Sequence, residues 1–227
     1  MTGWFEGTGE ILSAIAAGDS WMLSEAMRAP AIWPLGLIAM LLTAMLLTAM
    51  LILLIFRLVP WTERNLDKTI MVVSYLLIGG IIFVEVIRRF VFSVQAPWST
   101  TLPPFLFLIM TYFGCSYNVK LRTHLAFAEF RTSMRRTGQM GCLILDAVLW
   151  IGFSWVVVVT SSRVVANSAA NFQIMLGTDG IMQWWFMLSV PIAFTMLVAR
   201  VLENLLEDLA NFRSGDTLIT QTVIGGK

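Results

Sequence analysis

Residues able to do acid–base or metal chemistry are few and widely spaced in this chain. It has one histidine, His124, and two cysteines, Cys115 and Cys142, with no CxxC or Cys/His pattern around them. A lone histidine cannot supply both axial ligands of a membrane cytochrome b haem, and two isolated cysteines cannot hold an iron–sulfur cluster. We interpret both cysteines as small packing residues. We therefore expect no cofactor-binding residue and no metal ligand in this chain.

Catalytic patterns are missing from the sequence as well. No Gly-rich phosphate loop occurs, which argues against a subunit that hydrolyses nucleotide, and no carboxylate pair or Ser/His/Asp set stands out. The ionisable residues at membrane depth are Glu85, Asp146 and Arg200, each near the end of an apolar run. Such residues either serve transport directly or snorkel and pair with a neighbouring helix. We predict that the protein is not an enzyme and has no catalytic residue.

The composition indicates an integral membrane protein. Hydrophobic residues make up 58% of the chain and charged residues 13%, and the mean hydropathy is +0.80. Soluble domains come closer to about one half apolar and about one quarter charged residues. The formal net charge of +1 gives no overall basic field, so we expect no nucleic-acid partner.

Apolar runs of membrane-spanning length determine the expected architecture. The run 31–56 is 26 residues without a charge and as a helix would reach about 39 Å, enough to cross a bilayer with tilt. Further runs occupy 69–87, 98–119, 140–160 and 181–199. The sequence thus predicts an all-α membrane protein with about five transmembrane helices, in which an additional helix over 31–56 precedes a four-helix domain over 69–208.

The remaining segments are polar or mixed. Residues 1–30 combine aromatic, acidic and glycine residues, which fits either an amphipathic helix at a membrane surface or a loosely ordered tail. We expect a polar connector over 57–68, a basic segment over 120–136 and a polar loop that contains Arg163, Asn167, Asn171 and Asp179. The end of the chain, 209–227, is expected to be a cytoplasmic tail with little fixed structure.

Counting basic residues on each side predicts the topology. With the amino terminus outside, four lie outside: Arg28, Arg88, Arg89 and Arg163. The other eleven of the 15 lie inside: Arg57, Arg64, Lys68, Lys120, Arg122, Arg131, Arg135, Arg136, Arg200, Arg213 and Lys227. Because lysine and arginine accumulate on the cytoplasmic side, we expect a multi-pass protein of the bacterial inner membrane with its carboxyl terminus in the cytoplasm.

An ordered set of motifs carries a family resemblance. The chain contains, in this order, Arg89-Phe-Val-Phe92, Pro97-Trp98-Ser99, an apolar span with Gly114-Cys-Ser116, and His124-Leu-Ala-Phe127. Together they resemble the DctQ-type small membrane subunit of tripartite ATP-independent periplasmic (TRAP) transporters. Trp184-Trp185 and the segment from Pro191 look like the start of that family's last helix. Thr100, Thr101 and Pro104 depart from the family's pattern, and Ala128, with Glu129 beside it, stands where the family has an aspartate.

The resemblance implies a division of labour. In this family a periplasmic solute-binding protein captures the substrate and a large permease subunit carries it with sodium ions. The small subunit packs beside the large one as a static scaffold, helps to position the binding protein, and takes no part in catalysis. The expected substrates are organic acids, and the expected partners are the large permease, the binding protein and phospholipids. Sodium would bind in the large subunit rather than in this chain.

Within this resemblance, Arg88, Arg89 and Trp98 are candidates for contact with lipid or a partner at the periplasmic face, or they simply anchor a helix end. His124 and Glu129 would serve structure or partner contact on the cytoplasmic side. Trp184, Trp185 and Pro191 mark the last helix. The alternative function is a membrane anchor for a respiratory or redox enzyme, with a quinone site near Trp184-Trp185; an independent channel is disfavoured because no polar helix could line a pore.

Overall fold

A computed structural model describes residues 2–29, 35–122 and 134–218, and all of its named elements are helical. Along the chain these are α1 (Thr2–Ala17), α2 (Ser20–Ala26), α3 (Leu35–Leu58), α4 (Pro60–Val91), the 3₁₀ turn η1 (Pro97–Thr100), α5 (Leu102–Lys120), α7 (Arg136–Ala170), α8 (Trp184–Met187) and α9 (Ser189–Ser214). Among the described residues, five helices are long and apolar enough to cross a membrane. The predicted all-α membrane fold is confirmed.

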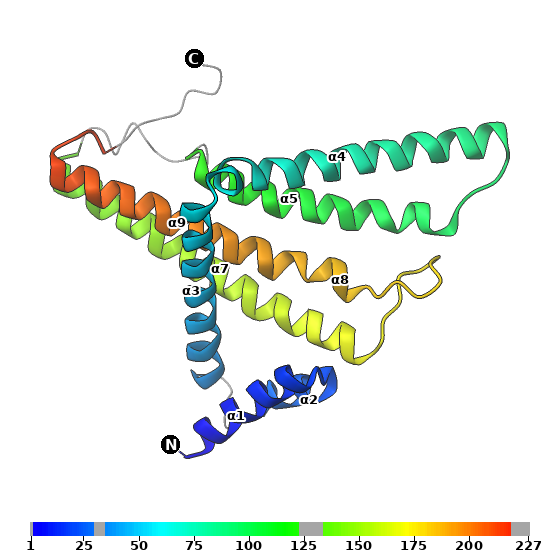
Figure 1. Cartoon of the computed structure of the whole chain (residues 1–227), viewed down its shortest axis with the longest axis horizontal. Coiled ribbons are helices and arrows are strands. Elements are labelled where there is room, and N and C mark those ends of the chain that lie inside the picture. Colours follow the sequence, from blue (N-terminus) through cyan, green and yellow to red (C-terminus); the bar gives the residue numbers. More distant parts are fainter. Residues whose placement is uncertain (1, 30–34, 123–133, 219–227) are drawn as a thin grey trace.

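Helix α9 forms the centre of the bundle. It packs against α3, α5 and α7, and α4 joins the bundle through α5 (Figure 1). The core on α9 includes Phe194, Leu197 and Val198, which meet Met45 and Ala49 of α3. Half of the spanning part of α9 is buried, but only 6% of that of α4. Most of α4 therefore faces lipid or a partner protein.

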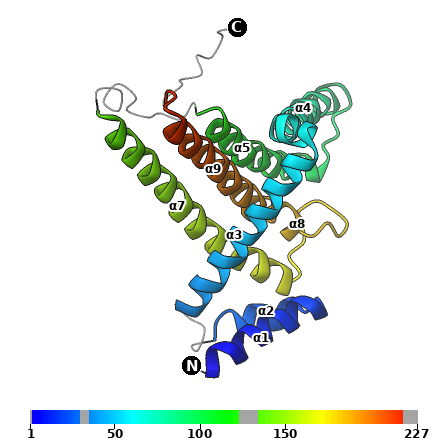
Figure 2. The same cartoon turned by 60° about the vertical axis from the view of Figure 1, so that its left-hand side comes forward.

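Helices α1 and α2 form a hairpin at the end of α7. Asp19 caps α2, its carboxylate accepting hydrogen bonds from the amides of Trp21 and Met22 at 3.0 Å each. Ile11 of α1 packs with Ala26 and Met27 at the end of α2. Both views place this hairpin beside the last turns of α7, where α2 makes its contacts (Figures 1 and 2). Residues 1–30, for which a tail was the alternative, are therefore helical over most of the described part.

Two connections predicted as polar are helical instead, the first over most of its length and the second in part. Helix α4 begins at Pro60, so most of the connector 57–68 lies within one helix of 32 residues. Proline fits the first position of a helix because the amide hydrogen it lacks would have no intrahelical partner. Helix α7 runs on through Arg163 and Asn167 to Ala170. Hydropathy alone placed the start of α4 too late and the end of α7 too early, because it follows the bilayer thickness rather than the continuity of backbone hydrogen bonds.

The last helix also differs from the predicted single run 181–199. The helix is interrupted at Leu188, between α8 and α9, so Pro191 lies in the first turn of α9 rather than in the interior of one long helix. At the other end α9 continues to Ser214 and closes on Gly215, whose φ is +93°. A left-handed residue after the last turn is a common helix stop. The expected loose tail therefore starts later than residue 209, and residues 219–227 lie outside the described part.

Candidate functional site

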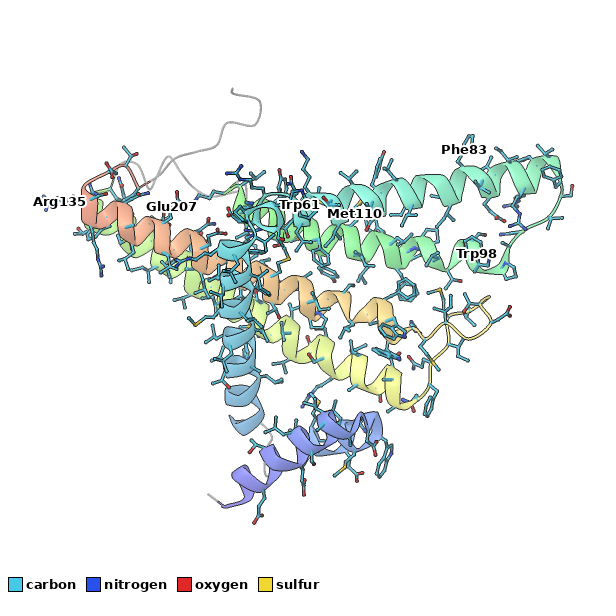
Figure 3. The ribbon with its side chains drawn as sticks, viewed as in Figure 1. Trp61, Phe83, Trp98, Met110, Arg135 and Glu207 are labelled. Carbon is cyan, nitrogen blue, oxygen red and sulfur yellow. The ribbon has the colours of Figure 1, made fainter. Side chains whose placement is uncertain are left out.

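Two groups of polar contacts lie at opposite ends of the bundle. The charged end comprises Asp67, Lys120, Arg122, Arg200 and Asp208. The other end is called the hairpin end after the turn between α4 and α5, which is distinct from the α1–α2 hairpin, and it comprises Glu85, Ala96, Trp98 and Gly177. Figure 3 places Glu207 and Arg135 at the charged end, far from Trp98 at the hairpin end. Helix direction explains the separation, because α4 starts at one end of the bundle and stops at the other.

Arg200 is the centre of the charged end. Its side chain is 0% exposed, and its Nη2 bonds to Asp67 Oδ2 at 3.0 Å and to the Glu63 carbonyl at 2.7 Å. Nη1 reaches Glu203 Oε2 at 2.9 Å, and the guanidinium lies 4.0 Å from the centre of the Phe56 ring. Charged groups inside a protein are tolerated only when they are paired and hydrogen-bonded. Arg200 thereby links α9 to α4 and α3.

Lys120 and Asn204 extend these contacts to α5. The Lys120 ammonium donates to the same Glu63 carbonyl that Arg200 uses. The Asn204 amide donates to the Val119 carbonyl at 2.9 Å, near the carboxyl end of α5, where a helix leaves carbonyls without an internal partner. The charged end therefore joins α4, α5 and α9 by contacts that do not depend on apolar packing.

Two further arginines secure the end of α9. Arg122 bonds to Asp208 at 2.6 Å and Glu207 at 3.1 Å, and to the Asn204 carbonyl at 3.1 Å. Arg136, at the start of α7, donates to the carbonyls of Asn211, Phe212, Gly215 and Asp216. A cation at a helix carboxyl end also interacts favourably with the helix dipole. These contacts fix α9 to α7 and to the segment after α5.

The hairpin end is closed by a carboxylate whose role the sequence left open. Glu85 Oε1 accepts a hydrogen bond from the Ala96 amide at 2.9 Å, across the turn between α4 and η1. Ser93 adopts φ +54°, and the Val94 amide bonds back to the Arg88 carbonyl at 3.2 Å. This geometry stops α4 after Val91. Glu85 thus has a structural partner within the chain.

The loop between α7 and α8 rests on this turn. Gly177, with φ +80°, lies so close to η1 that an added Cβ would be 2.6 Å from the Pro97 oxygen. The Met175 amide bonds to the Ile181 carbonyl at 2.8 Å, so the loop folds back on itself. Trp184 and Trp185 follow, with ring centres 4.3 Å apart. The two connections at this end therefore form one surface.

The candidate residues from the sequence lie at the hairpin end, at the buried start of α9, or outside the described part. Arg88 and Arg89 lie in the last turn of α4, and Trp98 lies in η1 and is 39% exposed. Trp185 is exposed, whereas Pro191 is buried at the start of α9. His124 and Glu129 belong to residues 123–133, which the structure does not describe. The lipid-contact and partner-contact roles of these residues stay predictions.

Sequence reasoning missed the Arg200–Asp67 pair. The two residues are 133 positions apart, and Asp67 was assigned to a connector rather than to a helix. One signal was available: Arg200 follows an apolar run directly and needs an anionic partner at the same depth. Asp67 and Glu63 stand at the matching end of the second apolar run, so charge matching would have proposed this pair.

A comparison with protein families decides what kind of chain this is. Residues 78–211 match the model of the DctQ component of tripartite ATP-independent periplasmic transporters. The chain belongs to this family. The sialic acid TRAP transporter small permease protein SiaQ of Vibrio cholerae serotype O1 is 23% identical over 164 residues, which cover 70% of this chain and 92% of the relative. The predicted resemblance is confirmed.

Membership explains the architecture. The chain is a TRAP transporter small permease subunit and a multi-pass protein of the inner membrane, and its family is one component of a three-part transporter. The matched region 78–211 starts within α4 and reaches the last turn of α9. Helices α1, α2 and α3 precede the match. The charged end draws Asp67 from before the matched region and Arg200 from within it.

Proposed function

We propose that this small permease subunit is the static scaffold of a sodium-coupled organic-acid transporter. It packs beside the large permease subunit, which binds sodium and moves the substrate, and it neither catalyses a reaction nor binds the ion. The observation that carries this proposal is the buried Arg200–Asp67 pair with its contacts to Glu63 and Glu203. A helix bundle held by a buried ion pair resists the relative helix movements that a carrier needs.

The exposed face of α4 supports a large apolar partner. Apolar side chains that point away from the other helices include Val73, Leu76, Phe83, Val86 and Phe90, and Figure 3 shows Phe83 on the outer side of α4. In a membrane such a face contacts either lipid or another protein. Because α4 is the least buried of the five spanning helices, it offers the most exposed surface for the large subunit.

Purification tests the assembly directly. A tagged version of this chain, expressed together with the large permease subunit encoded beside it, should retain that subunit in mild detergent. The same preparation in liposomes should take up an organic acid only when a sodium gradient and the periplasmic binding protein are supplied. Release of the chain without any large hydrophobic partner would count against the proposal.

The redox-anchor alternative is less favoured, since the family is a transporter component. An absorption spectrum of the purified complex distinguishes the two functions. The transporter proposal expects no haem absorption, whereas a Soret band would support a redox complex.

The proposed orientation puts the hairpin end in the periplasm and the charged end in the cytoplasm. On this orientation Arg88, Arg89 and Trp98 are available to lipid head groups or to the binding protein, as are Trp184 and Trp185. His124 and Glu129 would then face the cytoplasm near the large subunit. The excess of lysine and arginine at the charged end supports this choice.

Thiol labelling checks the orientation. Glu10 is exposed on α1, so Glu10→Cys in a background with Cys115 and Cys142 replaced by serine should react with a membrane-impermeant maleimide in intact spheroplasts. A cysteine at the exposed Arg213 should react only after the membrane is opened. Labelling of the Arg213 position but not of the Glu10 position in intact spheroplasts would show the opposite orientation.

A further inference from the structure

A pocket lies between the α1–α2 hairpin and α7, and its lining shares no residue with the charged end or the hairpin end. Its volume is about 580 Å³, and its lining includes Arg28, Arg163, Asn167, Ser24 and Met27. Ser24 belongs to α2, and Arg28 lies two residues after the end of this helix, while Arg163 and Asn167 lie on α7. The walls thus come from two segments that are far apart in sequence and side by side in space (Figure 2).

The polar groups in this pocket suit an anion. Arg28 is oriented by a hydrogen bond from Nη2 to Asn167 Oδ1 at 3.2 Å, which leaves further guanidinium donors available. No carboxylate is among the described residues that line the pocket, and the nearby Glu25 is exposed on α2 outside that lining. Two guanidinium groups beside a hydroxyl and an amide match the oxygens of a phosphate group.

The position of the pocket points to a lipid as the source of that phosphate. Arg163 lies seven residues before Ala170, the last residue of α7, and therefore about 10 Å inside the helix end. The hairpin exposes Leu12, Ile15 and Trp21, at 64%, 59% and 66%. Apolar and tryptophan side chains exposed on a short helical hairpin are typical of a segment lying in the membrane interface. The pocket then opens at the level of lipid head groups.

We propose that Arg28 and Arg163 form a binding site for the phosphate group of an anionic phospholipid, which fastens the amino-terminal hairpin to α7 at the membrane surface. The buried Met27 and the exposed Val164 add apolar side chains to the lining, where acyl carbons would pack. The site belongs to this chain alone and does not depend on the proposed transport role.

Binding measurements on the full-length protein in neutral detergent test the site. Dihexanoyl phosphatidylglycerol and inorganic phosphate are titrated separately against the wild type, Arg28→Gln, Arg163→Gln and the double variant. We expect saturable binding of the lipid that weakens about fivefold for each arginine removed. Arg213→Gln, which removes an equal charge from an exposed position near the end of α9, is the matched control and should bind like the wild type.

The outcomes separate the two sources of phosphate. Binding of the lipid, with little binding of inorganic phosphate, supports a head-group site. Equal affinity for inorganic phosphate with the same dependence on both arginines supports the anion site but makes a soluble phosphate its ligand. Absence of saturable binding for both probes, or equal binding by the wild type and the double variant, would overturn the proposal. Elution profiles and melting temperatures establish whether each variant is folded. If the double variant does not fold, the single variant Arg28→Gln, which changes an exposed side chain, provides the test.

Discussion

Arg200 is a buried cation surrounded by groups from α3, α4 and its own helix, α9. Its bonds go to Asp67, to Glu203 and to the Glu63 carbonyl, and the Phe56 ring covers one face. Replacing a buried ion pair by apolar residues is often neutral, whereas removing one partner leaves an uncompensated charge. The pair therefore specifies how α4 and α9 fit together more than it adds to stability.

Asp67→Asn should destabilise the protein strongly. Arg200 would keep its charge in a buried position and lose its anionic partner on α4, which costs about 3–5 kcal/mol for such pairs. The measurement is the melting temperature of the detergent-solubilised protein, followed by size-exclusion chromatography. The double variant Asp67→Leu/Arg200→Leu should recover much of the loss, because both charges are then gone.

Glu207→Gln is the matched control for this experiment. Its side chain is 65% exposed, and an exposed ion pair such as that with Arg122 contributes about 0–1 kcal/mol. A melting temperature lowered equally by Asp67→Asn and Glu207→Gln would mean that Arg200 is not buried as described.

At the scale of elements, the turn between α4 and α5 depends on Glu85. Its carboxylate accepts from the Ala96 amide, and Ala96 is only 4% exposed. Glu85→Ala should leave this buried donor unsatisfied, at about 1–3 kcal/mol. Hydrogen exchange at Ala96 should become faster, whereas Glu85→Gln, which keeps an acceptor oxygen, should change it little. Equal exchange in both variants would contradict this role.

Gly177 couples the α7–α8 connection to the same turn. Gly177→Ala combines a strained φ of +80° with a Cβ 2.6 Å from the Pro97 oxygen, so the loop must move away from η1. Gly180→Ala shares the strained backbone, with φ +120°, but meets nothing within 4 Å. We expect exchange at the Met175 and Thr178 amides to rise about tenfold more in the first variant than in the second. Indistinguishable exchange would exclude the contact.

Much of this arrangement could be predicted from the sequence, but the helix ends could not. The five spans follow from apolar runs, because the bilayer sets their length. Polar residues such as Asp67 and Arg163 were interpreted as the ends of the spans, although α4 and α7 continue through them. Asp67 is paired with a residue distant in sequence, and Arg163 lies toward the membrane surface. The break at Leu188 also left no clear signal. Of the site, the motif residues at the hairpin end were identified, whereas Arg200–Asp67 needed the fold to bring its members together.

At the scale of the whole molecule, contacts at both ends hold the described helices in one arrangement. Arg200, Arg122 and Arg136 tie α9 to its neighbours at the charged end, and Glu85 and Gly177 join the connections at the hairpin end. The long outer face of α4 remains open to a partner. The proposed scaffold role requires such an arrangement, because a subunit beside a moving neighbour must keep its own shape.

The central claim, that this subunit stays static during transport, is tested by fixing two of its helices to each other. The Asn204 side-chain amide of α9 donates to the Val119 carbonyl of α5 at 2.9 Å, so these two neighbouring positions are chosen for a cysteine pair, and formation of the disulfide is verified by gel mobility. Val119→Cys/Asn204→Cys is introduced with Cys115 and Cys142 replaced by serine, and sodium-driven uptake by the assembled transporter in liposomes is measured before and after oxidation. The account predicts that uptake continues at the same rate after the disulfide forms. Uptake that stops on oxidation and returns on reduction, while each single-cysteine control is unaffected, would contradict it.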